Sequence, residues 1–214
     1  HDLGFDDSQV GKVLVAMPSI LGCSIEMNLK PTVEWLKHDL GFDDSQVRKV
    51  LVASPSILGC SIEMNLKPTV EWLKDDLGFD DLQVRKVLVA MPSIFSFSIE
   101  MNLKPTVEWL KDNLGFDDSQ VRKVLVVMPS ILGCSIEKNL KPTVEWLKDD
   151  LGFDDSQVQK ILVTMPQMLG LSIEKNLKPT VEWLKHDLGF DDSQVGKVLV
   201  AMPSILGCSI EMNL

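Results

Sequence analysis

The chain has little of what several large protein classes require. Positive charge is in the minority, because 21 lysines and arginines face 31 aspartates and glutamates and leave a net charge of −10. That balance argues against a globally basic nucleic-acid surface, although a local basic stripe is compatible with it. No apolar run approaches the roughly 18–20 residues that a membrane-spanning helix needs, so no membrane partner is expected. No secretory or transit pattern is recognised at the start of the sequence.

What is present is a repeat that fills the whole chain. The nine letters LKPTVEWLK recur unchanged at 29–37, 66–74, 103–111, 140–148 and 177–185, which is a period of 37 residues. Periods of about 20–50 residues are typical of solenoids, in which each unit buries its apolar face only against its neighbours. We therefore predict one array over 1–214, with full copies at 1–37, 38–74, 75–111, 112–148 and 149–185 and a partial copy at 186–214. Because the sequence opens and closes in mid-repeat, we expect a fragment of a longer chain.

The first third of each copy predicts a helix with clear ends. In the second copy, Asp43 and Gln46 have the spacing of a capping box, and Phe42 and Val47 have that of a hydrophobic staple across it. Apolar residues then recur at helical spacing. Pro55 ends this helix, since the residue before a proline is pushed out of the α region.

The rest of the copy predicts two further helical segments after a tight turn. Ser61 is placed to cap a short helix over 62–66. Pro68 either kinks that helix or takes the first position of the next one, and we favour a short helix that runs into a longer one from Pro68. Gly78 then closes that helix in the left-handed conformation. No segment alternates apolar and polar residues for long, so the predicted fold is an all-α solenoid with about three helical segments per copy.

The repeated LKPTVEWLK stretch is interpreted mainly as structure. Its leucines and valine fall on one side of a helix and form the predicted core stripe, while Trp72 lies roughly 100–140° away and is predicted to face the adjacent copy. Lys67 and Lys74 flank Glu71 at helical spacing, which weakens them as phosphate ligands.

Residues with catalytic or metal-binding chemistry do not form constellations. The cysteines share one repeat position with Phe97 and Leu171, so we interpret them as small buried apolar residues (Cys23, Cys60, Cys134 and Cys208). Their spacing fits no zinc pattern. The histidines share a position with aspartates, and the Asp-Asp pairs lie at predicted helix starts, where capping explains them. We predict no enzymatic activity, no catalytic residues, no metal, no cofactor and no small-molecule substrate.

One repeat position varies in its chemistry. The eleventh residue of each copy is Gly, Arg or Gln, and a lysine always follows it. On a helical wheel this pair points away from the core stripe, so stacked copies would align it into a basic ridge suited to a phosphate backbone. Ordinary solvated helix positions are the alternative interpretation. The predicted nucleic-acid-binding residues are Arg48, Lys49, Arg85, Lys86, Arg122, Lys123, Lys12, Lys160 and Lys197.

The repeat resembles a known family. Leu-Gly-Phe precedes the first helix, Met-Pro follows it, and the copy continues through Ile-Leu, the Glu-Lys-Asn-Leu-Lys-Pro of 137–142 and a closing Val-Glu-Trp-Leu. Together these resemble the mTERF repeat, named for mitochondrial transcription termination factors, over all 214 residues. The resemblance implies helices packed at right angles within each repeat, a curved solenoid, and location in a mitochondrion or chloroplast. It also implies binding of double-stranded DNA or structured RNA in transcription termination or another step of organellar gene expression.

Two features bear on how such a protein would act. The copies are nearly identical, which leaves little variety for distinguishing bases and favours binding mainly through the phosphate backbone. The acidic total favours the alternative function, a protein-interaction scaffold without nucleic-acid binding. A separate expectation concerns 205–214, where the last copy lacks its closing helix and is predicted to expose apolar surface and to fray or self-associate.

Overall fold

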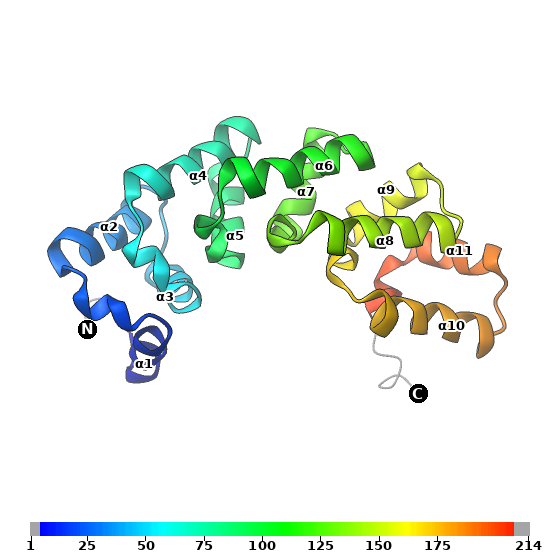
Figure 1. The fold of residues 1–214 in the computed structure, drawn as a ribbon, viewed down its shortest axis with the longest axis horizontal. Helices are drawn as coiled ribbons and strands as arrows, with labels where there is room; N and C mark the ends of the chain where they lie inside the picture. The colour runs from blue at the N-terminus through cyan, green and yellow to red at the C-terminus, as the bar shows by residue number, and fades with distance from the viewer. Residues whose placement is uncertain (1–4, 208–214) are drawn as a thin grey trace. The chain divides into compact units, whose positions relative to one another are not determined.

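The computed structural model describes residues 5–207, and every regular element in that range is helical (Figure 1). The predicted all-α solenoid is confirmed. The chain divides into two compact units, His1–Leu103 and Lys104–Leu214, so the division falls inside the third copy. Ile210 and Leu214, on which the expected fraying of the last copy partly depends, lie outside the described residues.

Each copy repeats the same series of elements. The first helices are α1 (Asp7–Ala16), α3 (Asp44–Ala53), α5 (Asp81–Ala90), α7 (Asp118–Val127), α9 (Asp155–Thr164) and α11 (Asp192–Ala201). The 3₁₀ turns after them are η1 (Pro18–Gly22), η3 (Pro55–Gly59), η6 (Pro92–Ser96), η8 (Pro129–Gly133), η11 (Pro166–Gly170) and η13 (Pro203–Gly207). The π-helical turns that follow are η2 (Ile25–Leu29), η4 (Ile62–Leu66), η7 (Ile99–Leu103), η9 (Ile136–Leu140) and η12 (Ile173–Leu177). The closing helices are α2 (Lys30–His38), α4 with η5 (Lys67–Glu71, Trp72–Asp76), α6 (Lys104–Leu114), α8 with η10 (Lys141–Glu145, Trp146–Asp150) and α10 (Lys178–His186).

The ends of the first helix form as the sequence predicts. The Gln46 N–H donates to Asp43 Oδ1 at 2.8 Å, and the Asp43 N–H donates to Gln46 Oε1 at 3.1 Å. This reciprocal capping box is present in all six copies and satisfies N–H groups that have no partner within the helix. The helix ends at Ala53, two residues before Pro55, as expected.

The predicted short helix over 62–66 is present as the π-helical turn η4, and it runs without a break into the predicted longer helix, which begins at Lys67, one residue before Pro68. Ser61 caps the start as predicted, since its Oγ accepts the Met64 N–H at 3.1 Å. The following turn is widened, with the Lys67 N–H bonding the Ile62 carbonyl five residues back. A proline ring clashes with the carbonyl four residues before it and offers no N–H, and a widened turn accommodates both. The sequence therefore specifies one helix with a wide first turn.

The closing helix ends at a left-handed glycine, as predicted. Gly78 has φ +68°, a region that residues with a Cβ rarely adopt. The Phe79 N–H then bonds the Leu73 carbonyl at 3.0 Å, and the phenyl ring is buried. The glycine thus turns the chain back so that Phe79 packs at the start of the next first helix.

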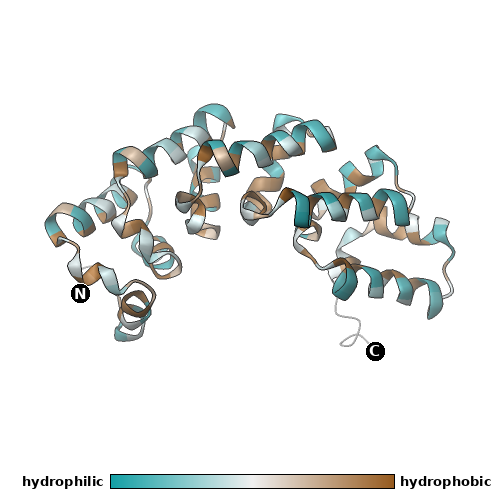
Figure 2. Ribbon diagram, viewed as in Figure 1, coloured by the Kyte–Doolittle hydropathy of each residue, from teal (hydrophilic) through white to brown (hydrophobic). Residues whose placement is uncertain are grey.

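The core lies between the helices and turns of adjacent copies. Figure 2 shows apolar residues gathered on the first helices and turns, with hydrophilic residues prominent along α8 and α10. Burial depends on the preceding copy: Val10 of the first copy is 43% exposed, whereas its equivalents Val47 and Val84 are 0% and 1% exposed. This is the neighbour-dependent burial expected of a repeat array.

The tryptophan of the repeat contributes to packing between copies. Within the first unit, Trp35 is buried and its ring meets that of Phe95 edge to face, with centroids 6.4 Å apart. Its partner lies two copies further along the sequence. The repeat tryptophan was predicted to face the adjacent copy, and the ring contact of Trp35 instead reaches the copy after it.

The cysteines differ from their prediction. Cys23, Cys60 and Cys134 are half-buried, and their Sγ atoms lie 3.4–3.7 Å from the carbonyl oxygen four residues earlier. Burial still raises the pKa of the Cys60 and Cys134 thiols. The position closes the 3₁₀ turn in extended conformation, so its side chain only partly reaches the core. Cys208 lies outside the described residues.

Candidate nucleic-acid interface

Six lysines occupy the same exposed position on the six first helices. Within each unit these helices are neighbours, with α1 against α3 and α3 against α5 in the first unit, and α7 against α9 and α9 against α11 in the second. Across residues 5–207, none of these six side chains takes part in an ion pair. We call them the lysine rows: Lys12, Lys49 and Lys86 in the first unit, and Lys123, Lys160 and Lys197 in the second.

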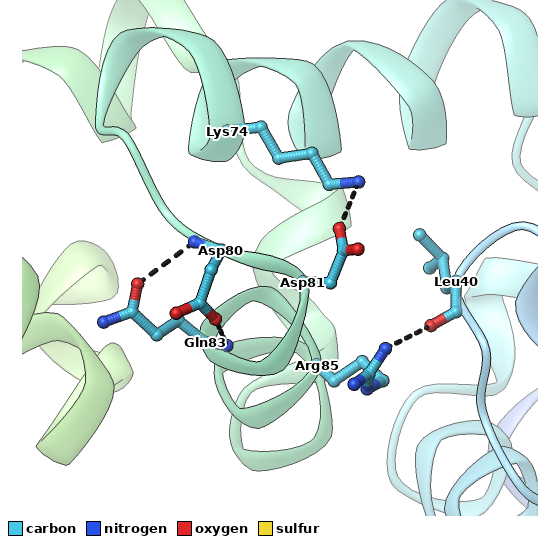
Figure 3. Close-up of polar contacts among 6 residues, drawn as sticks. All are labelled: Leu40, Lys74, Asp80, Asp81, Gln83 and Arg85. Atoms are coloured by element: carbon cyan, nitrogen blue, oxygen red, sulfur yellow. Dashed lines mark hydrogen bonds and ion pairs between the residues drawn. The ribbon is translucent and has the colours of Figure 1, made fainter.

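The residue before each lysine has a different environment. Arg48, Arg85, Arg122 and Gln159 are all half-buried. In Figure 3 the guanidinium of Arg85 points toward the preceding copy, where Nη1 donates to the Leu40 carbonyl at 3.4 Å. The nine predicted site residues therefore separate into exposed lysines and half-buried arginines. A wheel of one copy places both outward, because it omits the neighbouring copy that covers one side.

Gln159 makes the equivalent contact in the second unit. Its Nε2 donates to the Gly115 carbonyl at 2.8 Å and lies 3.4 Å from the Leu114 carbonyl. Arg85 and Gln159 thus both reach the loop that ends the closing helix before the preceding first helix. Sequence reasoning missed this contact, although the restriction of the position to Arg, Gln and Gly was a usable signal.

The lysines of LKPTVEWLK are engaged in ion pairs. Lys74 Nζ lies 2.7 Å from Asp81 Oδ1 across the turn between helices (Figure 3), and Lys67 pairs with Glu63 one helical turn back. Both lysines therefore pair with a carboxylate other than Glu71, the partner that the sequence predicted. The inter-helix pair recurs in the other complete copies, as Lys37–Asp44, Lys111–Asp118, Lys148–Asp155 and Lys185–Asp192 at 2.6–2.7 Å. These lysines are partly neutralised, which leaves the lysine rows as the more available cations.

The inter-helix ion pair makes a testable prediction about pH. The hydrogen bond from Lys74 lowers the pKa of Asp81, and its positive charge adds to the effect. Because the folded-state pKa is lowered, the pair stabilises the fold above the ordinary aspartate pKa of about 3.9 and is lost as pH falls through the folded value. A carboxyl NMR titration of Lys74→Met should return the pKa of Asp81 toward its ordinary range while leaving Asp118 unchanged. An unaltered Asp81 titration would show that the pair is not formed in solution.

The described residues contain neither a metal-binding cluster nor a helix suited to span a membrane. Between residues 5 and 207, no three or more histidine, cysteine, aspartate or glutamate side chains are grouped as a metal would need. In the same range, no helix has the length and apolarity required to cross a membrane.

The fold and this interface define a class, an α-helical repeat solenoid that presents rows of lysines on equivalent helices. The family model for mTERF matches residues 1–214, and the chain belongs to the mTERF family. This family is one of generally non-enzymatic helical-repeat proteins associated with nucleic-acid binding and transcription termination, typically in organelles. No curated protein matches the chain.

Proposed function

We propose that the chain binds double-stranded DNA or structured RNA through the phosphate backbone, in organellar transcription termination or a related step of gene expression. The observation that carries the proposal is the lysine row of each unit, which presents an exposed cation at the same position of each successive first helix, with no ion pair to any residue between 5 and 207. Phosphate contacts made by lysine and arginine dominate nucleic-acid affinity.

The spacing of the lysine rows suits a duplex. Packed helices lie about 8–10 Å apart, so neighbouring lysines should be separated by a similar distance. One strand of a duplex advances about 3.4 Å per base, so each step of the row corresponds to about two to three base pairs. Three lysines of one unit would then follow one strand over about half a helical turn.

The arginines have a secondary part in the proposal. Arg48, Arg85 and Arg122 remain proposed contacts beside the lysine rows, and a guanidinium has five N–H donors. Arg85 uses one of them on Leu40, so others remain for a phosphate. Because the arginines are half-buried, we assign the larger share of phosphate binding to the lysines.

Electrophoretic mobility shifts across a salt series test the proposal. The double variant Lys49→Gln/Lys86→Gln should weaken duplex binding and reduce the salt-dependence slope by about two, since each lost phosphate contact removes about 0.9. Its matched control is Lys30→Gln/Lys67→Gln in the same unit, which removes the same charge from lysines paired with Glu26 and Glu63. The control should leave the slope close to its original value.

The outcomes separate the candidate functions. Equal loss in both variants would mean that only total charge matters, and the assignment to the lysine rows would be wrong. Absence of any shift at low salt, together with recovery of protein partners from nuclease-treated extract, would favour the protein-interaction scaffold.

A further inference from the structure

The eleventh repeat position contributes a hydrogen-bond donor to the preceding copy wherever it carries a side chain whose contacts are described. Arg85 donates to the Leu40 carbonyl, and Gln159 donates to the Gly115 carbonyl. Both donors are planar N–H groups, and both acceptors lie in the Leu-Gly segment that ends the closing helix. The array thus contains two filled examples of one small binding site.

At Gly196 the same site lacks its donor. Helix α11 has the sequence DSQVGKVLVA, so no side chain extends toward Leu151 and Gly152 of the preceding copy. A hollow of about 440 Å³ lies there, lined in part by Leu151, Gly152, Phe153 and Gly196. Within residues 5–207, no side chain donates a hydrogen bond to Leu151 or Gly152. The hollow therefore keeps the acceptors of the filled sites without their partner.

Two carboxylates lie beside the hollow. An adjoining hollow of about 290 Å³ shares Leu151, Gly152 and Gly196 and is also lined by Asp149, Asp150 and the ion pair of Lys185 with Asp192. The two residues before the acceptor loop are His38 and Asp39 at the Arg85 site, and Asp112 and Asn113 at the Gln159 site. The Gly196 site thus has two carboxylates where each filled site has one.

The lysines on the rim do not exclude a guanidinium. Lys160 and Lys197 line the larger hollow, and their equivalents at the Arg85 site are Lys49 and Lys86. Arg85 occupies its own site with that pair of lysines at the same repeat positions. A guanidinium is therefore compatible with this arrangement of charge.

We propose that the hollow at Gly196 binds a guanidinium group supplied from outside the chain, either by an arginine side chain of a partner protein or by a free guanidino compound. The group donates to the Leu151 and Gly152 carbonyls, as Arg85 and Gln159 donate at their own sites. The hollow adjoins Lys160 and Lys197 of the lysine row in the second unit, but its two carbonyl acceptors are not among the groups proposed to contact phosphate.

The test is a ¹⁵N NMR titration of the full chain with N-acetylarginine amide. Saturable shifts are expected at the Gly152 and Gly196 amides, with at least tenfold weaker binding of N-acetyllysine amide, whose ammonium lacks the planar donors. Gly196→Gln should abolish the response, because its side chain supplies the missing donor. A Cβ at this position would lie 3.3 Å from Phe153 Cε1, a close contact that a small shift of the ring relieves.

The chain offers a matched control and a converse variant. Helix α1 has the same ten-residue sequence as α11, and a Cβ on Gly11 would meet nothing within 4 Å. Gly11→Gln should therefore leave binding unchanged. Gln159→Gly should create a second binding site that shifts the Gly115 amide, which keeps the test decisive even if Gly196→Gln folds poorly.

Further titrations identify the source of the guanidinium group, and three results would overturn the proposal. Tighter binding of an arginine-containing tripeptide than of the free amide indicates a protein partner, and equal binding indicates a free guanidino compound. The proposal is overturned if Gly152 and Gly196 do not respond, or if Gly196→Gln responds like the unaltered chain. It is also overturned if inorganic phosphate shifts these amides and the arginine amide does not.

Discussion

Replacing Leu73 with alanine is expected to lower the free energy of unfolding by about 2–5 kcal/mol. Leu73 is 0% exposed, as are its equivalents Leu36, Leu110 and Leu147. The substitution removes apolar surface from the core and leaves a cavity, and both effects destabilise the folded state. Leu73 also supplies the carbonyl that accepts the Phe79 N–H at the helix end, but alanine retains that group. Loss of packing should therefore account for the whole effect.

Urea denaturation followed by circular dichroism measures this change. The matched control is Met64→Ala, which lies in the same helical segment and removes a side chain that is 79% exposed. An exposed substitution of this kind typically changes stability by no more than about 0.5 kcal/mol. If the two variants unfold at the same urea concentration, the leucine stripe of LKPTVEWLK does not form the core.

The elements that the sequence predicted well depend on local chemistry. The box between Asp43 and Gln46, the cap at Ser61 and the left-handed turn at Gly78 each involve atoms only a few residues apart. Such contacts follow from backbone geometry within one copy. For that reason they could be predicted before any packing was known.

The predictions that failed depend on neighbouring copies or on small adjustments of the backbone. The widened turn η4 starts the following helix at Lys67, one residue before the predicted position at Pro68. Lys74 pairs with Asp81 rather than with the nearby Glu71, because the first turn of the next helix lies close to Lys74. Arg85 donates a hydrogen bond to the Leu40 carbonyl, although the helical wheel predicts that its side chain points outward. A pattern within one copy does not contain these distances.

A signal of inter-copy packing was nevertheless present in the sequence. The methionine of Met-Pro in one copy approaches the glycine that ends the 3₁₀ turn of the next copy. For example, a Cβ on Gly59 would lie 3.1 Å from Met17 Cε. The second copy carries Ser54 in place of this methionine, and the third carries Ser96 in place of the matching glycine. In the second copy Ser54, which is smaller than methionine, is thus accompanied by Ser96, which is larger than glycine, in the third copy. Paired departures from a repeat can therefore identify residues that meet between copies.

Trp35→Ala is expected to destabilise the fold by about 3–5 kcal/mol, the range for truncating a buried large aromatic residue. Trp35 is 6% exposed and meets Phe95 edge to face. Its loss therefore removes both buried apolar surface and a contact between copies. The repeat gives a mild control, because Phe95→Leu restores the residue found at the equivalent positions Leu58 and Leu132. That exchange should cost less than about 1.5 kcal/mol.

A double-mutant cycle on Trp35 and Phe95 isolates the contact between copies. Unfolding of Trp35→Ala, Phe95→Leu and the double variant, followed by circular dichroism, should give a coupling of about 0.5–1.5 kcal/mol, as expected for an aromatic pair. Additive effects would mean that the two rings stabilise their own copies independently. A measurable coupling would show that the tryptophan of LKPTVEWLK joins separate copies into one structure, since stability in such arrays depends on interfaces between neighbouring units.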